Sequence, residues 1–435
     1  MSIELITLIM FGSLIIGLAL GLPLAFLLGG IAVVCTYFLW GPKAITMIVL
    51  QTFDWSKNFL VMAIPLFIFM GLLLQRSGVA ERLYEMMYRW AGRLRGGLAI
   101  GTVGICTIFA AMTGITGAAT VTMGIIALPA MLKRNYNRGL AMGSIATGGT
   151  LGILIPPSVM FIILGLVTQV SVGKLFAGGI FSGLALSLLI MSYIGIRAFL
   201  QPQLAPASPE KYTWREKISS VTGIIAPLLL ILAVLGAIFG GVATPTEAAA
   251  VGAFGALICV FAYGRFSWKL LSEVCYSTLR LSCMVIWILI GAACFVSIYT
   301  SVGATELIRE TIVGLEVNRW LVLIGTMFVV FIMGMFLDPG GIIMLAAPIF
   351  YPIVTALGFD PILFGVLFVI NLQIGYITPP FGFNLFYLKS VAPPDMTMGE
   401  IYINIYPFVA VLIVGMAMVM VFPQLATWLP SIIVK

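Results

Sequence analysis

Two short, glycine-rich stretches interrupt long apolar segments of this 435-residue chain, MTGITGAATVT at 112–122 and FLDPGGII at 336–343. Glycine permits positive φ and close backbone approach. Such a tip, placed at membrane depth, leaves carbonyl and N–H groups without helical partners. Carbonyl groups can replace the hydration shell of a hard cation such as Na⁺, and helix N-termini favour an anion. The two tips therefore predict a site for small ions.

Two Pro-Pro pairs interrupt apolar segments further along, at 156–157 and 379–380, which is 223 positions apart (379 minus 156). Proline has no N–H and clashes with the preceding helical turn, so each pair ends a helix. Freed backbone groups at membrane depth are tolerated only where they face protein or a water-filled cavity. The polar runs ATGGTLG (146–152) and NLQIGYIT (371–378) precede the pairs. Each pair thus predicts a broken helix that lines a cavity.

Asp338 is the one carboxylate expected near a tip, and its position in the first tip is occupied by Ile115 (338 minus 223). An ionisable group at membrane depth is costly and indicates function. Asp338 could ligate Na⁺ or cap the helix that follows it, and Asp before Pro-Gly-Gly is also a good turn. By contrast, Glu247 in Thr244-Pro245-Thr246-Glu247 fits a capping box, which is a structural role.

Candidate site residues come from the tips and from the segments around the breaks. A single small-residue pattern of this kind more often serves helix packing, but two tips and two breaks at matching positions favour a site. No lysine or arginine lies in the predicted cavity, so hydroxyls, helix N-termini and bound sodium would meet the charge of an anion. The candidates for sodium are Thr113, Gly114, Gly149, Thr150, Gly152, Asp338, Gly340, Gly341, Gly375 and Thr378, and those for substrate are Thr116, Thr120, Pro156, Ser158, Thr378 and Asn384.

The composition is that of a polytopic membrane protein. The chain is 62% hydrophobic and 9% charged, with a mean hydropathy of +1.18, whereas globular domains carry about 25% charged residues. It has no histidine, which removes histidine bases and metal ligands, and no Walker A sequence for ATP hydrolysis. We therefore expect no enzyme, no organic cofactor and no nucleic-acid partner. A channel would differ from a carrier in showing flux without saturation.

The two halves of the chain repeat the same order of elements at an offset near 223 positions. Each half has two scaffold spans, a third span, an interfacial arm helix, a tip, a broken helix and a final span. We expect an all-α fold in which each tip closes a re-entrant helical hairpin. The predicted boundaries are a first repeat over 1–200 (hairpin 112–132, broken helix 138–168), a linker over 201–218, and a second repeat over 219–435 (hairpin 320–357, broken helix 361–389).

The basic residues orient the chain, since lysine and arginine concentrate on the cytoplasmic side of a membrane. Both ends of the first hairpin carry arginines, whereas acidic residues flank the second hairpin. Tracing the spans onward places most of the 22 basic residues and the linker in the cytoplasm. The first hairpin then enters from the cytoplasm and the second from outside, with both termini periplasmic. This arrangement is an inverted repeat.

These motifs resemble those of the large membrane subunit of TRAP transporters, the tripartite ATP-independent periplasmic family. The matching stretches span nearly the whole chain. One departure is Thr113-Gly114-Ile115-Thr116, where related sequences often have Ser-Gly-Ser-Ser. The stretches are GLPLAFLLGG, IPLFIFMGLLLQRSGVAERL, TGITGAATVTMG, GGTLGILIPPS, TPTEAAAVGA, MGMFLDPGGIIM and NLQIGYITPPFGFNLF.

The resemblance implies an elevator-type secondary transporter in the inner membrane of a bacterium or archaeon, driven by a sodium gradient. It implies two protein partners, a small four-helix membrane subunit and a periplasmic substrate-binding protein, besides contact with membrane lipid. Family substrates are mostly organic acids, and the sequence does not choose among them. The alternative is a Na⁺/carboxylate elevator carrier that works without a binding protein.

Overall fold

The computed structural model describes every residue except 1, 92, 208–209, 211, 315–316 and 434–435. All regular secondary structure in the described residues is helical, which confirms the predicted all-α class. Among the residues that the structure describes, seven helices are long and apolar enough to cross a membrane. The helices of the first half are α1 Ile3–Ala19, α2 Leu24–Trp40, α3 Ile45–Lys57, α4 Ala63–Arg76, α5 Val79–Ala91, α6 Gly97–Thr113, α7 Thr116–Leu132, α8 Arg138–Thr150, α9 Val159–Thr168 and α10 Val172–Leu200.

The second half repeats this order with one merger and with one added helix at each of its ends. The 34-residue α14 runs unbroken where the first half has α3, a short 3-10 turn at Phe59–Met62 and α4. Its helices are α11 Trp214–Val221, α12 Ile225–Phe239, α13 Pro245–Ala262, α14 Trp268–Ser301, α15 Ala304–Gly314, α16 Arg319–Gly334, α17 Pro339–Ala356, α18 Pro361–Gly375, α19 Phe383–Val391, α20 Met398–Val421 and α21 Gln424–Ile433.

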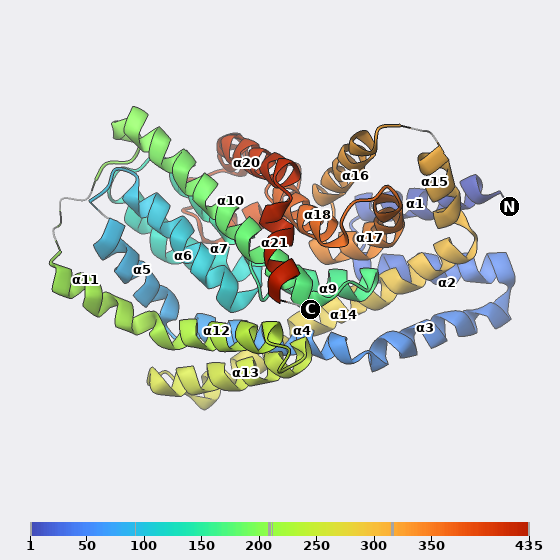
Figure 1. The fold of residues 1–435 in the computed structure, drawn as a ribbon, viewed down its shortest axis with the longest axis horizontal. Helices are drawn as coiled ribbons and strands as arrows, with labels where there is room; N and C mark the ends of the chain where they lie inside the picture. The colour runs from blue at the N-terminus through green and yellow to red at the C-terminus, as the bar shows by residue number, and fades with distance from the viewer. Residues whose placement is uncertain (1, 92, 208–209, 211, 315–316, 434–435) are drawn as a thin grey trace.

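A scaffold of α2, α4, α13 and α14 forms one layer of the molecule. Helix α13 packs along α4, α2 packs along α14, and α14 also packs against α4. In Figure 1 this layer runs along the lower part of the view, and the two hairpins lie above it toward opposite ends. The capping box predicted at the start of α13 is present, since Thr244 and Glu247 bond each other's backbone N–H groups. This confirms the structural role of Glu247.

The first hairpin consists of α6 and α7, joined at Gly114 and Ile115, and the second of α16 and α17, joined at residues 335–338. The second hairpin thus occupies 319–356, close to the predicted 320–357. The first begins at Gly97 instead of residue 112, because the apolar run before the tip is itself a full helix. The predicted linker also ends sooner, since Thr213 caps α11 and begins a helical segment that reaches Phe239.

After each proline break, the next helix packs on the hairpin of the other repeat. Helix α8 packs on its own hairpin, but α9, beyond Pro156-Pro157, packs against α17 of the second hairpin. Reciprocally, α18 packs on α16, and α19, beyond Pro379-Pro380, packs against α7. Two copies related by a twofold axis pack reciprocally in this way, as expected for a duplicated transporter fold. The breaks therefore bring both hairpins into one block.

Candidate functional site

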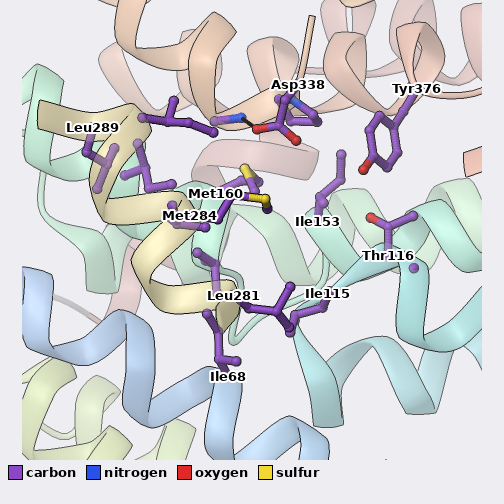
Figure 2. A pocket seen from close by; sticks show the side chains of 18 of the residues that line it. Ile68, Ile115, Thr116, Ile153, Met160, Leu281, Met284, Leu289, Asp338 and Tyr376 are labelled. Atoms are coloured by element: carbon purple, nitrogen blue, oxygen red, sulfur yellow. Dashed lines mark hydrogen bonds between the residues drawn. The ribbon is translucent and has the colours of Figure 1, made fainter. Parts of the chain in front are cut away.

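The two hairpin tips meet at one cavity of about 100 Å³ on the boundary with the scaffold. Figure 2 shows Asp338 and Tyr376 reaching into it from one side, with Thr116 and Ile115 opposite. Helix α14 closes the third side with apolar side chains that include Leu281, Met284 and Leu289. Ile115 and Asp338, the positions that the repeat makes equivalent, therefore lie in the same cavity.

Three helix N-termini converge on this central cavity. The first residues of α7, α9 and α17 (Thr116, Val159 and Pro339) all line it. Unpaired N–H groups at a helix start carry about half a positive elementary charge. None of the described residues that line the cavity is a lysine or arginine. The positive potential available to an anion therefore comes from backbone dipoles. The starts of α7 and α9 have no side-chain cap, whereas the Asp338 side chain caps the start of α17.

Asp338 caps the second tip and also faces the cavity. Its Oδ2 accepts a hydrogen bond from the Gly340 N–H at 3.0 Å, which makes it the N-cap of α17. The side chain lines the cavity and is half-buried. A Cβ on Gly340 would lie 3.2 Å from that same Oδ2, so glycine leaves room for the carboxylate. The two roles left open by the sequence, cap and cation ligand, are thus compatible in one geometry.

The Thr116 hydroxyl is the buried polar group of the cavity that lacks a partner. Thr116 is 3% exposed, and its Oγ1 has no hydrogen-bond partner among the described residues. Tyr376 and Tyr387 also line the cavity. Sequence reasoning missed both tyrosines and the face of α14. A tyrosine beside Gly375 and ahead of a Pro-Pro pair is a polar group at membrane depth, and that signal could have found Tyr376.

The first tip packs closely on the first break. Gly114 has φ +61°, and a Cβ there would lie 2.5 Å from the Pro157 carbonyl oxygen. A Cβ on Gly152 would lie 3.2 Å from the carbonyl carbon of Ile115. At the second tip, Gly375 lies against Gly334 of the hairpin, where an added Cβ would come within 2.7 Å of the Cα. Glycine thus brings tip and break into backbone contact in both repeats.

Four predicted hydroxyls are bonded to carbonyl groups near them in the chain. Thr113 donates to Phe109 and Thr150 to Thr147 within their own helices, and Thr378, just beyond the end of α18, donates back to Ile374. Ser158 donates across the first break to the Ile153 carbonyl at 2.5 Å. Of the predicted residues, those in the cavity lining are Gly114, Thr116, Asp338 and Gly340, and those outside it are Thr113, Thr120, Gly149, Thr150, Gly152, Pro156, Ser158, Gly341, Gly375, Thr378 and Asn384.

Thr120 and Asn384 form a hydrogen-bonded link between the repeats instead of lining the cavity. The Thr120 hydroxyl donates to Asn384 Oδ1 at 2.7 Å, and Asn384 Nδ2 donates to the Ala146 carbonyl at 2.6 Å. Gly149 leaves room for this link, because a Cβ there would lie 1.9 Å from the Thr120 hydroxyl oxygen. All of these groups are buried. Asn384 thus ties α19 to the first hairpin and the first broken helix.

Replacing Asn384 by alanine should lower the free energy of unfolding by about 1–3 kcal/mol, because it removes the partner of the buried Thr120 hydroxyl and the bond to the Ala146 carbonyl. Thermal unfolding of the purified protein in detergent measures the loss. Asn404, whose side chain donates to the Glu400 carbonyl of its own helix, provides the matched control, and Asn404→Ala should change stability less. Equal losses in the two variants would contradict the role of Asn384 as a link.

Residues 11–425 match the family described as "Tripartite ATP-independent periplasmic transporter, DctM component". The chain is 34% identical over 403 residues to the C4-dicarboxylate TRAP transporter large permease protein DctM of Pseudomonas aeruginosa, covering 92% of this chain and 93% of that protein. It is 33% identical over 391 residues to the isethionate TRAP transporter permease protein DctMQ of Oleidesulfovibrio alaskensis, covering 88% of this chain and 60% of that protein.

A solved structure shares the fold. The YdaH transporter of Alcanivorax borkumensis, described as having an unusual topology, aligns with a TM-score of 0.63 at 16% identity. The alignment covers 93% of this chain and 98% of that one. At this identity the likeness concerns the arrangement of the helices alone.

Proposed function

Because the chain belongs to the DctM family as a TRAP transporter large permease, we propose that it couples the uptake of an organic anion to a sodium gradient. The single observation that carries this proposal is the central cavity. Three helix N-termini from both repeats meet there beside one carboxylate, and no basic side chain is present in the described lining. N-termini favour an anion, whereas Asp338 and the tip carbonyls suit a hard cation.

An anion and a cation bound together fit this cavity better than either alone. An anion by itself would face the Asp338 carboxylate, and like charges repel. A sodium ion beside Asp338 would remove that repulsion, so binding of the anion would depend on sodium. The Thr116 hydroxyl, buried without a partner, is free to donate to the anion. This dependence is the physical basis that we propose for coupling.

The names of the relatives support the class of substrate that we propose. Their names specify C4-dicarboxylate and isethionate, both of which are small organic anions. Isethionate is a sulfonate, so the property that the two share is the negative charge. From the dicarboxylate relative we propose a carboxylate-type anion as the cargo. The cavity of about 100 Å³ is smaller than the several hundred Å³ of a typical ligand pocket. We infer that loading requires the tips and α14 to separate.

Such a separation is the movement that an elevator mechanism needs. The hairpins and broken helices form one interlocked block, and the scaffold packs mainly on itself. In our proposal the block carries the anion past the scaffold. The partners would be a small membrane subunit on the scaffold and a periplasmic substrate-binding protein. The name DctMQ of the longer relative, of which this chain covers 60%, supports the first partner.

Uptake into liposomes tests the proposal. The chain is reconstituted with its small subunit, the binding protein is added outside, and labelled succinate and isethionate serve as probes. Uptake should require an inward sodium gradient and the binding protein. Uptake without the binding protein would favour a binding-protein-independent Na⁺/carboxylate carrier. Uptake that does not saturate and ignores sodium would indicate a channel and would contradict the proposal.

A further inference from the structure

A second cavity, of about 480 Å³, lies between the scaffold and the first hairpin. Gln75 and Arg76 at the end of α4 line one wall, and Thr122 of α7 lines the opposite wall. The turn between α13 and α14, with the first residues of α14, closes the cavity and contributes Arg265 and Lys269. This inner cavity lies on the side that the basic residues mark as cytoplasmic.

The inner cavity continues the boundary on which the central cavity lies. The same three helices line both, at two depths: α4 through Ile68 and then Gln75, and α14 through Leu281 and then Glu273. These steps correspond to about 10–12 Å along a helix axis at 1.5 Å per residue. Helix α7 likewise passes from Gly117 in the central cavity to Thr122 in the inner one. A solute leaving the central cavity between α7 and α14 would therefore enter the inner cavity.

Basic side chains without ion-pair partners face this inner cavity. Arg76 is paired with Glu273, whereas Arg265 and Lys269 are exposed and make no ion pair among the described residues. Glu81 is the remaining acidic residue in the lining. With Arg76 and Glu273 neutralising each other, two positive charges face one negative charge. An anion that enters the cavity would be attracted.

The opposite end of α14 lacks this charge. A third cavity of about 420 Å³ is lined by Gln51, Gln169 and Ser297, and none of the described residues in its lining is charged. Helix α14 thus borders all three cavities in turn, through Glu273, Leu281 and Ser297. The positive charge is confined to one end of the route.

We infer that the inner cavity is the release-side vestibule of the transporter and that Arg265 and Lys269 form an anion-binding pair within it. This inference rests on the proposed function, since it assigns the anion a second binding site that it reaches after leaving the central cavity. The Gln75 amide donates to the Thr122 hydroxyl at 2.9 Å between scaffold and hairpin. That contact and the Arg76–Glu273 pair border the vestibule. Because the Gln75–Thr122 hydrogen bond joins the scaffold to the hairpin, it must break when the hairpin moves along α14.

Charge-selective labelling of a thiol tests the pair directly. Ile125 lines the vestibule and is 60% exposed, so Ile125→Cys places the thiol there. Cys275 and Cys283, the exposed cysteines, are first replaced by serine. Anionic and cationic methanethiosulfonate reagents are then compared. The double variant Arg265→Gln, Lys269→Gln should lower the ratio of the anionic to the cationic labelling rate about fivefold, because it removes two partly screened positive charges near the thiol.

Two controls make the result specific. Arg93→Gln with Arg95→Gln removes the same charge from exposed positions outside the vestibule lining and should leave the ratio unchanged. A thiol at Ser297, in the uncharged cavity, should not respond to the loss of Arg265 and Lys269. An unchanged ratio at position 125, or an equal fall with the Arg93 and Arg95 pair, would overturn the inference.

Protection by ligand separates a solute from a lipid. Succinate, as the probe, should slow labelling at position 125 in the parent and not in the Arg265→Gln, Lys269→Gln variant. If phosphatidylglycerol in the liposomes gives that protection and succinate does not, the pair holds a lipid headgroup and the inference is wrong. The labelling needs no transport. Failed sodium-coupled uptake with an intact charge effect would thus refute the proposed function, whereas normal uptake without the charge effect would refute only the vestibule.

Discussion

Replacing Asp338 by asparagine should raise the sodium concentration that half-saturates uptake by about tenfold or more. Asparagine keeps a side-chain oxygen that can accept the Gly340 N–H, so the cap of α17 survives, but the charge is lost. A tenfold change is about 1.4 kcal/mol, which is less than the attraction of about 4 kcal/mol between unit charges 4 Å apart at an effective dielectric constant of 20. Uptake into liposomes over a range of sodium concentrations measures the shift.

Asp338→Ala separates the two roles of this residue. It should show the same loss of sodium affinity together with a loss of about 1 kcal/mol in stability, because the cap is removed as well. Thermal unfolding in sodium-free detergent reports the second effect. Unchanged sodium dependence in both variants would leave Asp338 with the cap alone, and the cation would then have to be held by backbone carbonyls of the tips.

Replacing Gly114 by alanine should abolish uptake and lower the free energy of unfolding. Gly114 has φ +61°, which costs an L-residue about 1–2 kcal/mol. The added Cβ would also lie 2.5 Å from the Pro157 carbonyl oxygen, and overpacking typically costs about 1–3 kcal/mol. The Cβ is fixed to the backbone of the tip, and the Pro157 carbonyl is part of the backbone of the break, so no side chain can move aside. The tip must therefore shift away from the break, and the start of α7 leaves the central cavity. Uptake and thermal unfolding are the measurements.

The matched control is Gly325→Ala in the second hairpin, where a Cβ would meet no atom within 4 Å. That variant should be neutral or slightly more stable, because alanine favours a helix interior over glycine by about 1 kcal/mol. Gly114→Asn separates strain from contact, since asparagine tolerates positive φ but carries a Cβ. Normal uptake by Gly114→Asn would show that the approach to Pro157 is unimportant.

Local chemistry in the sequence was sufficient to predict where helices break. Proline pairs and glycine tips act on the backbone of their own segment, so the breaks at 156–157 and 379–380 and the capping box at Glu247 follow from residue type alone. The boundaries of neighbouring apolar helices were harder. Arg93, Arg95 and the left-handed Gly96 do precede the start of α6 at Gly97, but the predicted hairpin took in only the apolar segment after its tip, so the first hairpin extends further back than predicted.

Partners distant in sequence could not be predicted from residue type. Thr120 and Asn384 are both polar residues beside the predicted site, and each suits a substrate contact. The structure pairs them with each other, 264 positions apart. Likewise, the apolar face of α14 reads as an ordinary membrane span, and only packing against the tips makes Leu281 and Met284 part of a cavity. Which polar group faces a ligand and which faces another residue is decided by tertiary contact.

The reciprocal packing of helices after the proline breaks also has a consequence for how the protein is made. The Thr120 hydroxyl and the Ala146 carbonyl, both in the first repeat, have their bonds completed by Asn384 of the second. At about 5–20 residues per second, a ribosome needs on the order of tens of seconds to add the intervening residues. During that interval the nascent first hairpin lies in the membrane with the Thr120 hydroxyl still without its partner and with the surface for α19 uncovered. The first repeat therefore cannot complete its own core until α19, near the end of the chain, has been inserted, and a messenger truncated before codon 384 yields a first repeat without this link.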